Sequence, residues 1–308
     1  MRILFMGTPD IAAQSLRTML ETLPEEYKVC GVFTREDKPV GRKQILTAPP
    51  VKQVAQAHGI DVFQPKTLRT PQAVEQVRQL APDLIVVVAY GRILPPEILK
   101  IPRYGAINLH VSLLPKYRGA APVQWAVIHG EKETGVTIMQ LDEGLDTGDI
   151  LFVQKVAIPE DMTSGELFEE VSGAGAALLC TAIRRIAAGE VAPVPQQHDQ
   201  ATLAPPLSKE MALFHFAQPA QQLHNLVRGL NPWPIAYFVY DGKKIKVRRT
   251  KRHSENGTPG QILSVNPLIV ACKEGALELV EVVPEGSKPM AGNAWAAGRR
   301  FSVGDVLE

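Results

Sequence analysis

The segment Leu84–Val88 is continuously apolar and consists mostly of β-branched residues. Such a strand is typical of a sheet whose two faces are both covered, as in parallel α/β proteins. Further strands are predicted at residues 2–6, 29–34, 61–63 and 106–111, with helices at 11–20 and 73–80. Because strands and helices alternate, we expect an open, mostly parallel, Rossmann-like sheet.

The second half of the chain has a different organisation. Strands at 136–141 and 150–156 flank an acidic turn, and a long helix over Ser164–Ala188 ends at Gly189. Residues 191–206 are rich in Pro, Gln and Ala without a sustained period, which indicates a linker. We therefore expect a first domain over 1–189, a linker over 190–207 and a second domain over 208–308.

The second domain reads as a small β structure. After a helix at 218–228, strands at 235–240 and 244–247 are joined by Asp241-Gly242, a strong hairpin signal. Short strands follow at 262–265, 268–272 and 276–283. This spacing favours an OB-like β-barrel.

Charge and cysteine content exclude several classes of protein. The 33 Lys and Arg residues nearly balance the 32 Asp and Glu residues, so any nucleic-acid signal must be local. The three cysteines form no CxxC pair, which argues against a disulfide framework or a zinc ribbon. The N-terminal apolar run is too short for a secretory signal, and we expect a cytoplasmic protein.

The first strand is followed by the turn Gly7-Thr8-Pro9-Asp10. Thr8 is expected to be the N-cap of the next helix, with Pro9 at its first position. The turn lacks GxGxxG, and no GxxxxGK[ST] occurs in the chain, so a dinucleotide or ATP phosphate loop is not indicated. The turn fits either a structural role or the wall of a ligand crevice at the carboxyl edge of the sheet.

Two polar side chains stand out on the strand at 106–111. Asn108 and His110 are two residues apart, so they point to the same face of the strand. They alternate with the apolar residues Ile107, Leu109 and Val111, and this pattern argues against a role for the polar pair in filling the core. A histidine taken alone at this position also fits a structural role.

The acidic turn over 142–149 contains three aspartates, a glutamate and two glycines. Its spacing does not fit an EF-hand, because Gly144 stands where a ligand is needed and Thr147 where glycine is needed. It fits either a solvated turn or a backbone shaped around a close neighbour.

Together these motifs resemble a known family. Asn108, His110, residues 112–115 (Ser-Leu-Leu-Pro) and Asp146 within Gly-Leu-Asp-Thr-Gly are similar to the formyltransferase domain. That domain is shared by methionyl-tRNA formyltransferases, glycinamide ribonucleotide formyltransferases and formyltetrahydrofolate-using hydrolases. Further segments resemble the methionyl-tRNA branch: residues 7–10, 87–91, 118–122, 207–210 and 231–234. Val111 and Tyr117 depart from the usual pattern, which has a smaller residue and a Trp there.

The resemblance implies a reaction and its residues. A formyl group would pass from 10-formyltetrahydrofolate to an amine, without a metal and without a covalent enzyme intermediate. The catalytic residues would be Asn108, His110 and Asp146. The folate would lie against two segments, whose expected contacts are Tyr90, Gly91, Ile93 and Leu94, and Ser112, Leu113, Leu114 and Pro115.

Two basic segments favour methionyl initiator tRNA as the acceptor. Residues 37–43 form a basic loop at a position where the family carries an insertion that probes the acceptor stem. Residues 243–252 hold seven Lys or Arg and no acid, which on a hairpin of an OB-like domain fits a phosphate-binding surface. The expected tRNA contacts are Lys38, Arg42, Lys43, Lys244, Lys246 and Arg248, in a chain that acts as a monomer.

Two other functions fit part of this pattern. A formyltransferase acting on a small amine would need neither the second domain nor its basic hairpin. A non-catalytic RNA-binding protein with a folate fold would not need Asn108, His110 and Asp146 together.

Overall fold

The structure is a computed structural model that describes residues 1–41 and 43–307. The described chain forms two compact units. Unit 1 consists of Met1–Gly119, Gly135–Val156 and Glu169–Leu203. Unit 2 consists of Ala120–Thr134, Ala157–Phe168 and the described chain from Ala204 onward. Both units are therefore discontinuous in sequence, unlike the simple succession of domains expected above.

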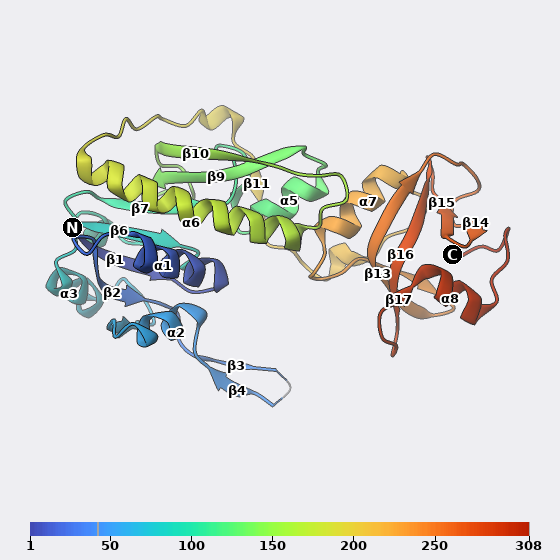
Figure 1. Cartoon of the computed structure of the whole chain (residues 1–308), viewed down its shortest axis with the longest axis horizontal. Coiled ribbons are helices and arrows are strands. Elements are labelled where there is room, and N and C mark those ends of the chain that lie inside the picture. Colours follow the sequence, from blue (N-terminus) through green and yellow to red (C-terminus); the bar gives the residue numbers. More distant parts are fainter. Residues whose placement is uncertain (42, 308) are drawn as a thin grey trace. The chain divides into compact units, whose positions relative to one another are not determined.

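The core of unit 1 is a seven-stranded sheet with the order β10-β9-β7-β6-β1-β2-β5 (Figure 1). Its strands are β1 (Arg2–Gly7), β2 (Lys28–Phe33), β5 (Val62–Phe63), β6 (Leu84–Val88), β7 (Ala106–His110), β9 (Glu133–Gln140) and β10 (Ile150–Ala157). Parallel pairing joins β5, β2, β1, β6 and β7 in that order, whereas β9 pairs antiparallel with β7. The mostly parallel α/β sheet predicted from the sequence is confirmed.

Helices cover both faces of this sheet. They are α1 (Asp10–Thr22), α2 (Pro50–Ala57), α3 (Pro71–Leu80), α4 (Pro96–Leu99) and α6 (Ser164–Ala188). Val77 of α3 and Ile98 of α4 share a buried cluster with Ile85 and Val87 of β6. On the opposite face α6 approaches β7 closely, since a Cβ on Gly175 would lie 2.9 Å from the Leu109 side chain. Asn108 and His110 therefore lie on the α3 face of the sheet, because residues alternate along a strand.

Helix α6 is long and apolar enough to cross a membrane by length and composition alone, and it is the one such helix among the described residues. Half of that stretch is buried inside the protein. Its buried residues include Leu167, Val171, Leu179 and Ile183. This packing is that of a core helix.

The start of α1 differs from the sequence-based expectation. Pro9 is the N-cap and α1 begins at Asp10, so the assignment of Thr8 as N-cap is wrong. The Thr8 hydroxyl instead donates to the carbonyl oxygen of Tyr90 at 3.3 Å. This contact with a distant segment replaces the local cap. It also fixes the turn after β1 to the segment that follows β6.

The basic loop expected at 37–43 is part of a β-hairpin. Its strands are β3 (Lys38–Val40) and β4 (Ile45–Thr47). Lys38 and Lys43 are exposed on it, whereas Arg42 lies outside the described residues. The hairpin base is fixed because the Asp37 carboxylate accepts from Lys52 Nζ at 2.9 Å and from Gln64 Nε2 at 2.8 Å.

Unit 2 contains an antiparallel sheet with the order β12-β13-β16-β15-β14, to which β17 adds beside β16. Its strands are β12 (Tyr237–Tyr240), β13 (Lys243–His253), β14 (Ile262–Val265), β15 (Leu268–Ala271), β16 (Ala276–Pro284) and β17 (Met290–Ala291), and its helices are α5 (Pro122–Ile128), α7 (Ala220–Gly229) and α8 (Gly292–Arg299). The core includes Phe214, Phe216, Phe238 and Trp295. The predicted C-terminal β domain is confirmed, although β13 is longer than the strand expected at 244–247.

The segment expected to be a linker is mostly exposed, but hydrogen bonds at Val194, Gln196 and Thr202 fix it to unit 1. It contains the 3-10 turn η1 (His198–Gln200) and the strand β11 (Leu203–Ala204), and the turn η2 (Glu210–Ala212) follows it. Gln196 is only 5% exposed. The packing depends on side-chain hydrogen bonds, which leave no periodic signal in the sequence.

Candidate active site

His110 lies at the carboxyl end of β7 and is 6% exposed. Its Nε2 atom is 2.9 Å from the carbonyl oxygen of Tyr117. A carbonyl oxygen can only accept, so Nε2 must carry the hydrogen. The Nδ1 atom faces Asp146, whose Oδ2 atom lies 3.6 Å away. The ring is thus oriented from both sides by groups on two different loops.

Asp146 belongs to a tightly folded turn between β9 and β10. The Asp142 carboxylate accepts from the Thr147 hydroxyl at 2.7 Å and from Gly144 N at 3.0 Å. A Cβ on Gly148 would lie 1.9 Å from the Gln140 carbonyl oxygen, so this position requires glycine. The close neighbours that the two glycines predicted are the protein's own atoms.

The backbone of Asp146 is left-handed, with φ of 53°, which is uncommon for a residue with a side chain. This conformation lets its Oδ2 atom accept from Gly119 N at 2.9 Å. The carboxylate is thereby fixed between the backbone that follows Arg118 and the ring of His110. The acidic turn therefore places the Asp146 carboxylate beside the carboxyl end of β7.

Asn108 is half-buried and lies on the same face of β7 as His110. It is paired in register with Val87 of β6 and Met139 of β9. Within the described part of the chain, its side-chain amide has no hydrogen-bond partner, so it is available to a ligand. The three residues predicted to be catalytic thus lie at one edge of the sheet.

Sequence reasoning missed a buried layer behind these residues. Arg118 is 8% exposed and donates from Nη2 to Gln196 Oε1 at 2.6 Å. Gln196 Nε2 donates to the carbonyl oxygens of Asp146 and Gly148 at 2.9 and 2.7 Å. The signal available in the sequence was a Gln that follows two prolines and starts a run of polar residues, which does not reveal these partners.

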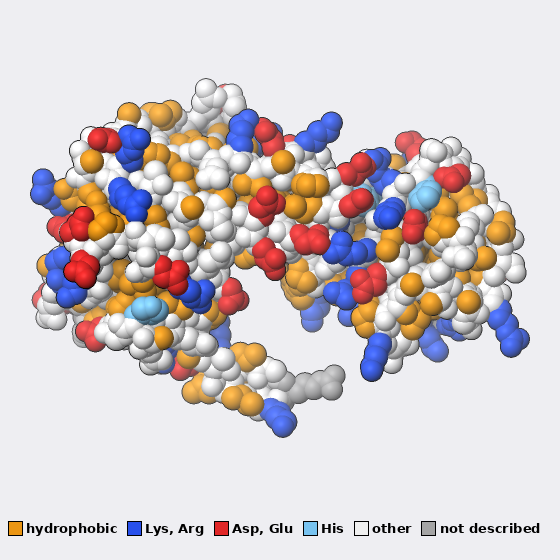
Figure 2. Space-filling view, in the orientation of Figure 1, with side chains coloured by type: hydrophobic (Ala, Val, Ile, Leu, Met, Phe, Trp, Pro, Cys, Tyr) orange, Lys and Arg blue, Asp and Glu red, His pale blue; other side chains and the backbone are white. Residues whose placement is uncertain are grey.

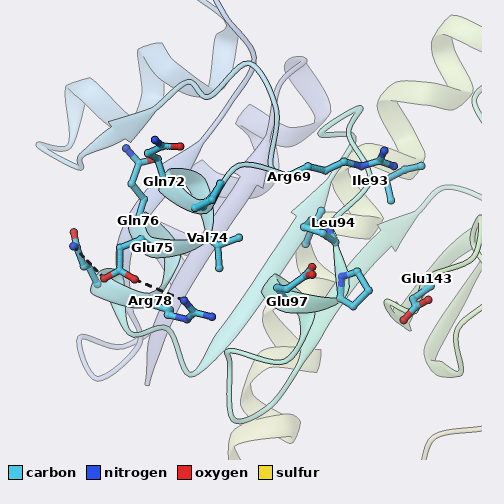
Figure 3. A pocket seen from close by; sticks show the side chains of 14 residues that line it. Arg69, Gln72, Val74, Glu75, Gln76, Arg78, Ile93, Leu94, Glu97 and Glu143 are labelled. Carbon is cyan, nitrogen blue, oxygen red and sulfur yellow. Dashed lines mark hydrogen bonds and ion pairs between the residues drawn. The ribbon is translucent and has the colours of Figure 1, made fainter.

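A large open cavity lies beside the predicted folate segment (Figure 3). Its volume is about 1090 Å³, and its walls come from one side of α3, residues 93–97 and Glu143. Ile93 and Leu94, two of the predicted folate contacts, line it together with Arg69. Figure 3 shows Leu94 between the α3 residues and Glu143. Glu143 comes from the same turn as Asp146, although Asn108, His110 and Asp146 themselves do not line the cavity.

The other predicted folate contacts do not line this cavity. The Ser112 hydroxyl donates to the Lys116 carbonyl oxygen at 2.7 Å, and Ser112 is fully buried. Leu114 is also buried, while Leu113 and Pro115 are half-buried. Any contact of this segment with a ligand would therefore involve Leu113, Pro115 or backbone atoms.

Tyr90 follows β6 and is 1% exposed. Burial raises the pKa of Tyr90 to about 12, although the nearby guanidinium groups of Arg92 and Arg35 act to lower it. Gly91 is exposed with φ of 73°, and its carbonyl oxygen accepts from Arg35 Nη1 at 2.8 Å. The Tyr90 side chain is thus part of the core, and its backbone contributes to the turn beside the cavity.

The basic strand β13 presents fewer free cations than its sequence suggests. Arg248 pairs with Glu281 at 2.9 Å, Arg249 pairs with Glu166 at 2.5 Å, and Arg252 pairs with Glu160. Lys244 and Lys246 are exposed, and Lys244 Nζ lies 4.7 Å from the centre of the Tyr237 ring. Figure 2 shows Asp and Glu side chains interspersed among the Lys and Arg side chains in this region.

The hairpin of β3 and β4 exposes an unusual number of apolar side chains (Figure 2). Val40, Ile45 and Leu46 are 56%, 62% and 67% exposed. A cluster of exposed apolar side chains typically marks a surface that contacts another molecule. Among the described residues, no group of His, Cys, Asp and Glu side chains has the geometry of a metal site.

Comparison with known proteins defines the class to which this fold and site belong. Residues 1–183 match the formyl transferase family model, and residues 206–300 match the model of the formyl transferase C-terminal domain. The chain belongs to the formyl transferase family.

Full-length relatives are more specific. The methionyl-tRNA formyltransferase of Acetivibrio thermocellus is 45% identical, over 100% of this chain and 99% of the relative. That of Bacillus subtilis is 43% identical, over 99% of this chain and 97% of the relative. Both alignments therefore extend over the sequence of both units of this chain.

Solved structures show the same fold at low sequence identity. The N-formyltransferase from Helicobacter canadensis, in complex with folinic acid and dTDP-3-aminofucose, has a TM-score of 0.68 and 18% identity, over 90% of this chain and 98% of that one. HypX from Aquifex aeolicus, in complex with tetrahydrofolic acid, has a TM-score of 0.64 and 19% identity, over 98% of this chain and 48% of that one.

Proposed function

We propose that this chain transfers the formyl group of 10-formyltetrahydrofolate to the amino group of methionyl initiator tRNA, producing N-formylmethionyl-tRNA. The observation that carries the proposal is the arrangement of Asn108, His110 and Asp146 at one sheet edge, with His110 held between Tyr117 O and Asp146. The similarity over full length to proteins named methionyl-tRNA formyltransferase supports the choice of acceptor.

The reaction begins when the amine nitrogen of methionyl-tRNA attacks the formyl carbon. A carbon–nitrogen bond forms, and the formyl oxygen becomes a tetrahedral oxyanion. The bond from carbon to the folate nitrogen then breaks, and that nitrogen leaves with a proton. The net proton movement is from the attacking amine to the leaving nitrogen.

Asn108 supplies a hydrogen-bond donor for the oxyanion. Its amide has no protein partner in the described chain and points from the same face of β7 as His110. A fixed donor aimed at developing charge stabilises the transition state more than the substrate, and removing one typically costs about 10²–10³ in rate.

His110 and Asp146 move the proton and stabilise charge. The His110 ring can take up a proton at Nδ1, because Nε2 already carries one that it donates to Tyr117 O. Asp146 lies 3.6 Å from Nδ1, where its carboxylate stabilises positive charge on the ring. The pair can therefore hold charge while the amine proton passes to the folate nitrogen.

The folate co-substrate binds in the cavity beside residues 93–97. Its ring system is expected to contact Ile93 and Leu94 together with the backbone of Tyr90 and Gly91. Of the segment Ser112, Leu113, Leu114 and Pro115, the contacts would come from Leu113, Pro115 and backbone atoms, because Ser112 and Leu114 are buried. The apolar side chains and backbone polar groups of these segments suit a flat aromatic ring with polar edges. No metal is needed for the reaction as written.

The tRNA binds along two basic surfaces. Lys244, Lys246 and Arg248 of β13 contact phosphates, and the hairpin with Lys38, Arg42 and Lys43 contacts the acceptor end. In this division of labour, residues 1–189 together with the following segment through Leu203 form the catalytic domain, and residues 208–308 form the tRNA-binding domain. The chain works in the cytoplasm as a monomer.

The experiment measures transfer of labelled formyl from 10-formyltetrahydrofolate to three acceptors: methionyl initiator tRNA, methionyl elongator tRNA and free methionine. The expected result is rapid formylation of the initiator only. Equal transfer to a free small amine would favour a small-amine formyltransferase instead. Binding of tRNA without transfer would favour a non-catalytic RNA-binding protein.

A further inference from the structure

The segment that follows α6 crosses the two loops that hold His110. We call residues 194–202 the strap. Val194 exchanges two backbone hydrogen bonds with Ile150, at 2.8 and 2.9 Å, which anchors the strap to the start of β10. Its other end is fixed because the Thr202 carbonyl oxygen accepts from Arg118 N at 2.8 Å. All these residues belong to unit 1.

The side chain of Gln196 uses its whole hydrogen-bonding capacity inside the protein. Its Oε1 atom accepts from Nε and Nη2 of Arg118, at 3.2 and 2.6 Å. Its Nε2 atom donates to the carbonyl oxygens of Asp146 and Gly148. A side-chain amide has two donor hydrogens and two acceptor positions, and all four are occupied. Gln196 therefore has no group left with which to bind a substrate.

The strap contacts the backbone at two positions that are both left-handed. Asp146 has φ of 53° and Tyr117 has φ of 60°. Such conformations are unfavourable for residues with side chains and persist only where the surroundings hold them. Gln196 holds Asp146 through its carbonyl oxygen, and the Thr202 hydroxyl accepts from Tyr117 N at 2.9 Å.

These two backbones present the two groups that contact the His110 ring. Tyr117 supplies the carbonyl oxygen at Nε2, and Asp146 supplies the carboxylate at Nδ1. We infer that Gln196 is a positioning residue, which holds the Asp146 turn so that its carboxylate faces His110 during formyl transfer. This inference depends on the proposed function, since it concerns the same reaction.

The first variant is Gln196→Met, which keeps the length of the side chain and removes all four hydrogen bonds. Small displacements of a catalytic group can cost about 10²-fold in rate, so kcat should fall by about that factor. The KM values for the folate and for methionyl initiator tRNA should not change, because no group that contacts either substrate is altered. The matched control is Gln197→Met, at the exposed neighbouring position, which should leave kcat and KM at wild-type values.

The second variant is Gln196→Glu, which serves where Gln196→Met does not fold. It keeps the acceptor for Arg118 but places a carboxylate oxygen against the carbonyl oxygens of Asp146 and Gly148. The kcat should again fall, because the two donors that hold the turn are lost. Wild-type kcat in Gln196→Glu would overturn the inference, as would a raised KM with unchanged kcat in either variant.

A double-mutant cycle tests whether Gln196 acts through Asp146. In an Asp146→Asn background, Gln196→Met should lower kcat little further, because the carboxylate that it positions is already absent. If the two effects multiply instead, Gln196 has only a general structural role and the inference is wrong. A wild-type enzyme that transfers no formyl group would overturn the proposed function itself, which is a separate outcome.

Discussion

The carboxylate of Asp146 faces Nδ1 of His110 at 3.6 Å, while the same oxygen accepts a hydrogen bond from Gly119 N. The second ring nitrogen of His110 is occupied by the Tyr117 carbonyl oxygen. One oxygen atom thus links an acidic turn, the end of β7 and the loop after it.

This relationship predicts that Asp146→Asn loses most of the activity. An asparagine oxygen can still accept from Gly119 N, so the turn should keep its shape, but the negative charge beside His110 is removed. Single-turnover transfer should fall by about 10²–10⁴-fold, the usual contribution of proton transfer by a positioned side chain. The single-turnover rate of His110→Ala should fall by a comparable factor. Circular dichroism and Tm check folding, and near-normal transfer by either variant would remove that residue from the mechanism.

The exposed face of β13 should bind phosphate without reading sequence. The triple variant Lys244→Ala, Lys246→Ala, Arg248→Ala should weaken initiator and elongator tRNA alike and reduce the salt slope by about 1 for each lost phosphate contact. Because Arg248 is already paired with Glu281, the two lysine changes should account for most of the loss.

Filter binding over a salt series measures this effect. The control is Lys288→Ala, an exposed lysine elsewhere in unit 2, which should leave the slope unchanged. Loss of affinity for one tRNA only, or an unaltered slope in the triple variant, would show that β13 is not a nonspecific phosphate surface.

The hairpin of β3 and β4 should contribute to the choice of tRNA. Ile45 and Leu46 are exposed on it, so Ile45→Ser with Leu46→Ser should not lower Tm. We expect kcat/KM for the initiator to fall toward the elongator value, because an exposed apolar patch typically contacts a bound partner and the variant loses that contact. Arg42→Ala should reduce the same discrimination. Measuring kcat/KM for both tRNAs tests the idea, which fails if their ratio is unchanged.

Glu166 should make unit 2 sensitive to acid. Its carboxylate accepts from Thr163 N at 2.8 Å and pairs with Arg249, and these contacts lower the pKa of Glu166 to about 2 from 4.5. The stabilisation is complete above pH 4.5 and is lost as the pH falls toward 2. Because the side chain is 44% exposed, solvent screening limits the contribution to about 1 kcal/mol.

Glu166→Gln should remove this part of the pH dependence. The variant should be less stable than wild type at pH 6 and equal to it near pH 2, as measured by thermal unfolding. The control is Glu169→Gln, an exposed glutamate on the same helix, which should change neither value. Parallel curves for wild type and Glu166→Gln between pH 4.5 and 2 would contradict the assignment.

Local patterns in the sequence were sufficient to predict the main strands and helices. The apolar run Leu84–Val88 gave the correct bounds of β6, because all five residues are buried. The expected helix over Ser164–Ala188 gave the correct bounds of α6, because Gly189 ends it with a positive φ. The shared face of Asn108 and His110 followed from strand alternation. Short helices such as α5 and α8 were missed, since each is less than three turns long and contains no strong cap signal.

Contacts between distant segments could not be predicted in the same way. Thr8 donates to Tyr90 O instead of capping α1, and Gln196 reaches two carbonyl oxygens about fifty positions earlier in the chain. A fragment ending at Gly189 would lack Gln196 and Thr202, so the catalytic domain needs the chain through Leu203 to keep its site.

The most direct measurement is the single-turnover rate of formyl transfer to methionyl initiator tRNA by Asn108→Ala, with both substrates saturating. Asn108 is half-buried on β7 and its amide has no partner within the described chain, so the substitution should leave Tm nearly unchanged. We predict a rate about 10²–10³-fold below wild type, as for the loss of one oxyanion donor. A rate close to that of wild type would contradict the proposed catalytic role of this sheet edge.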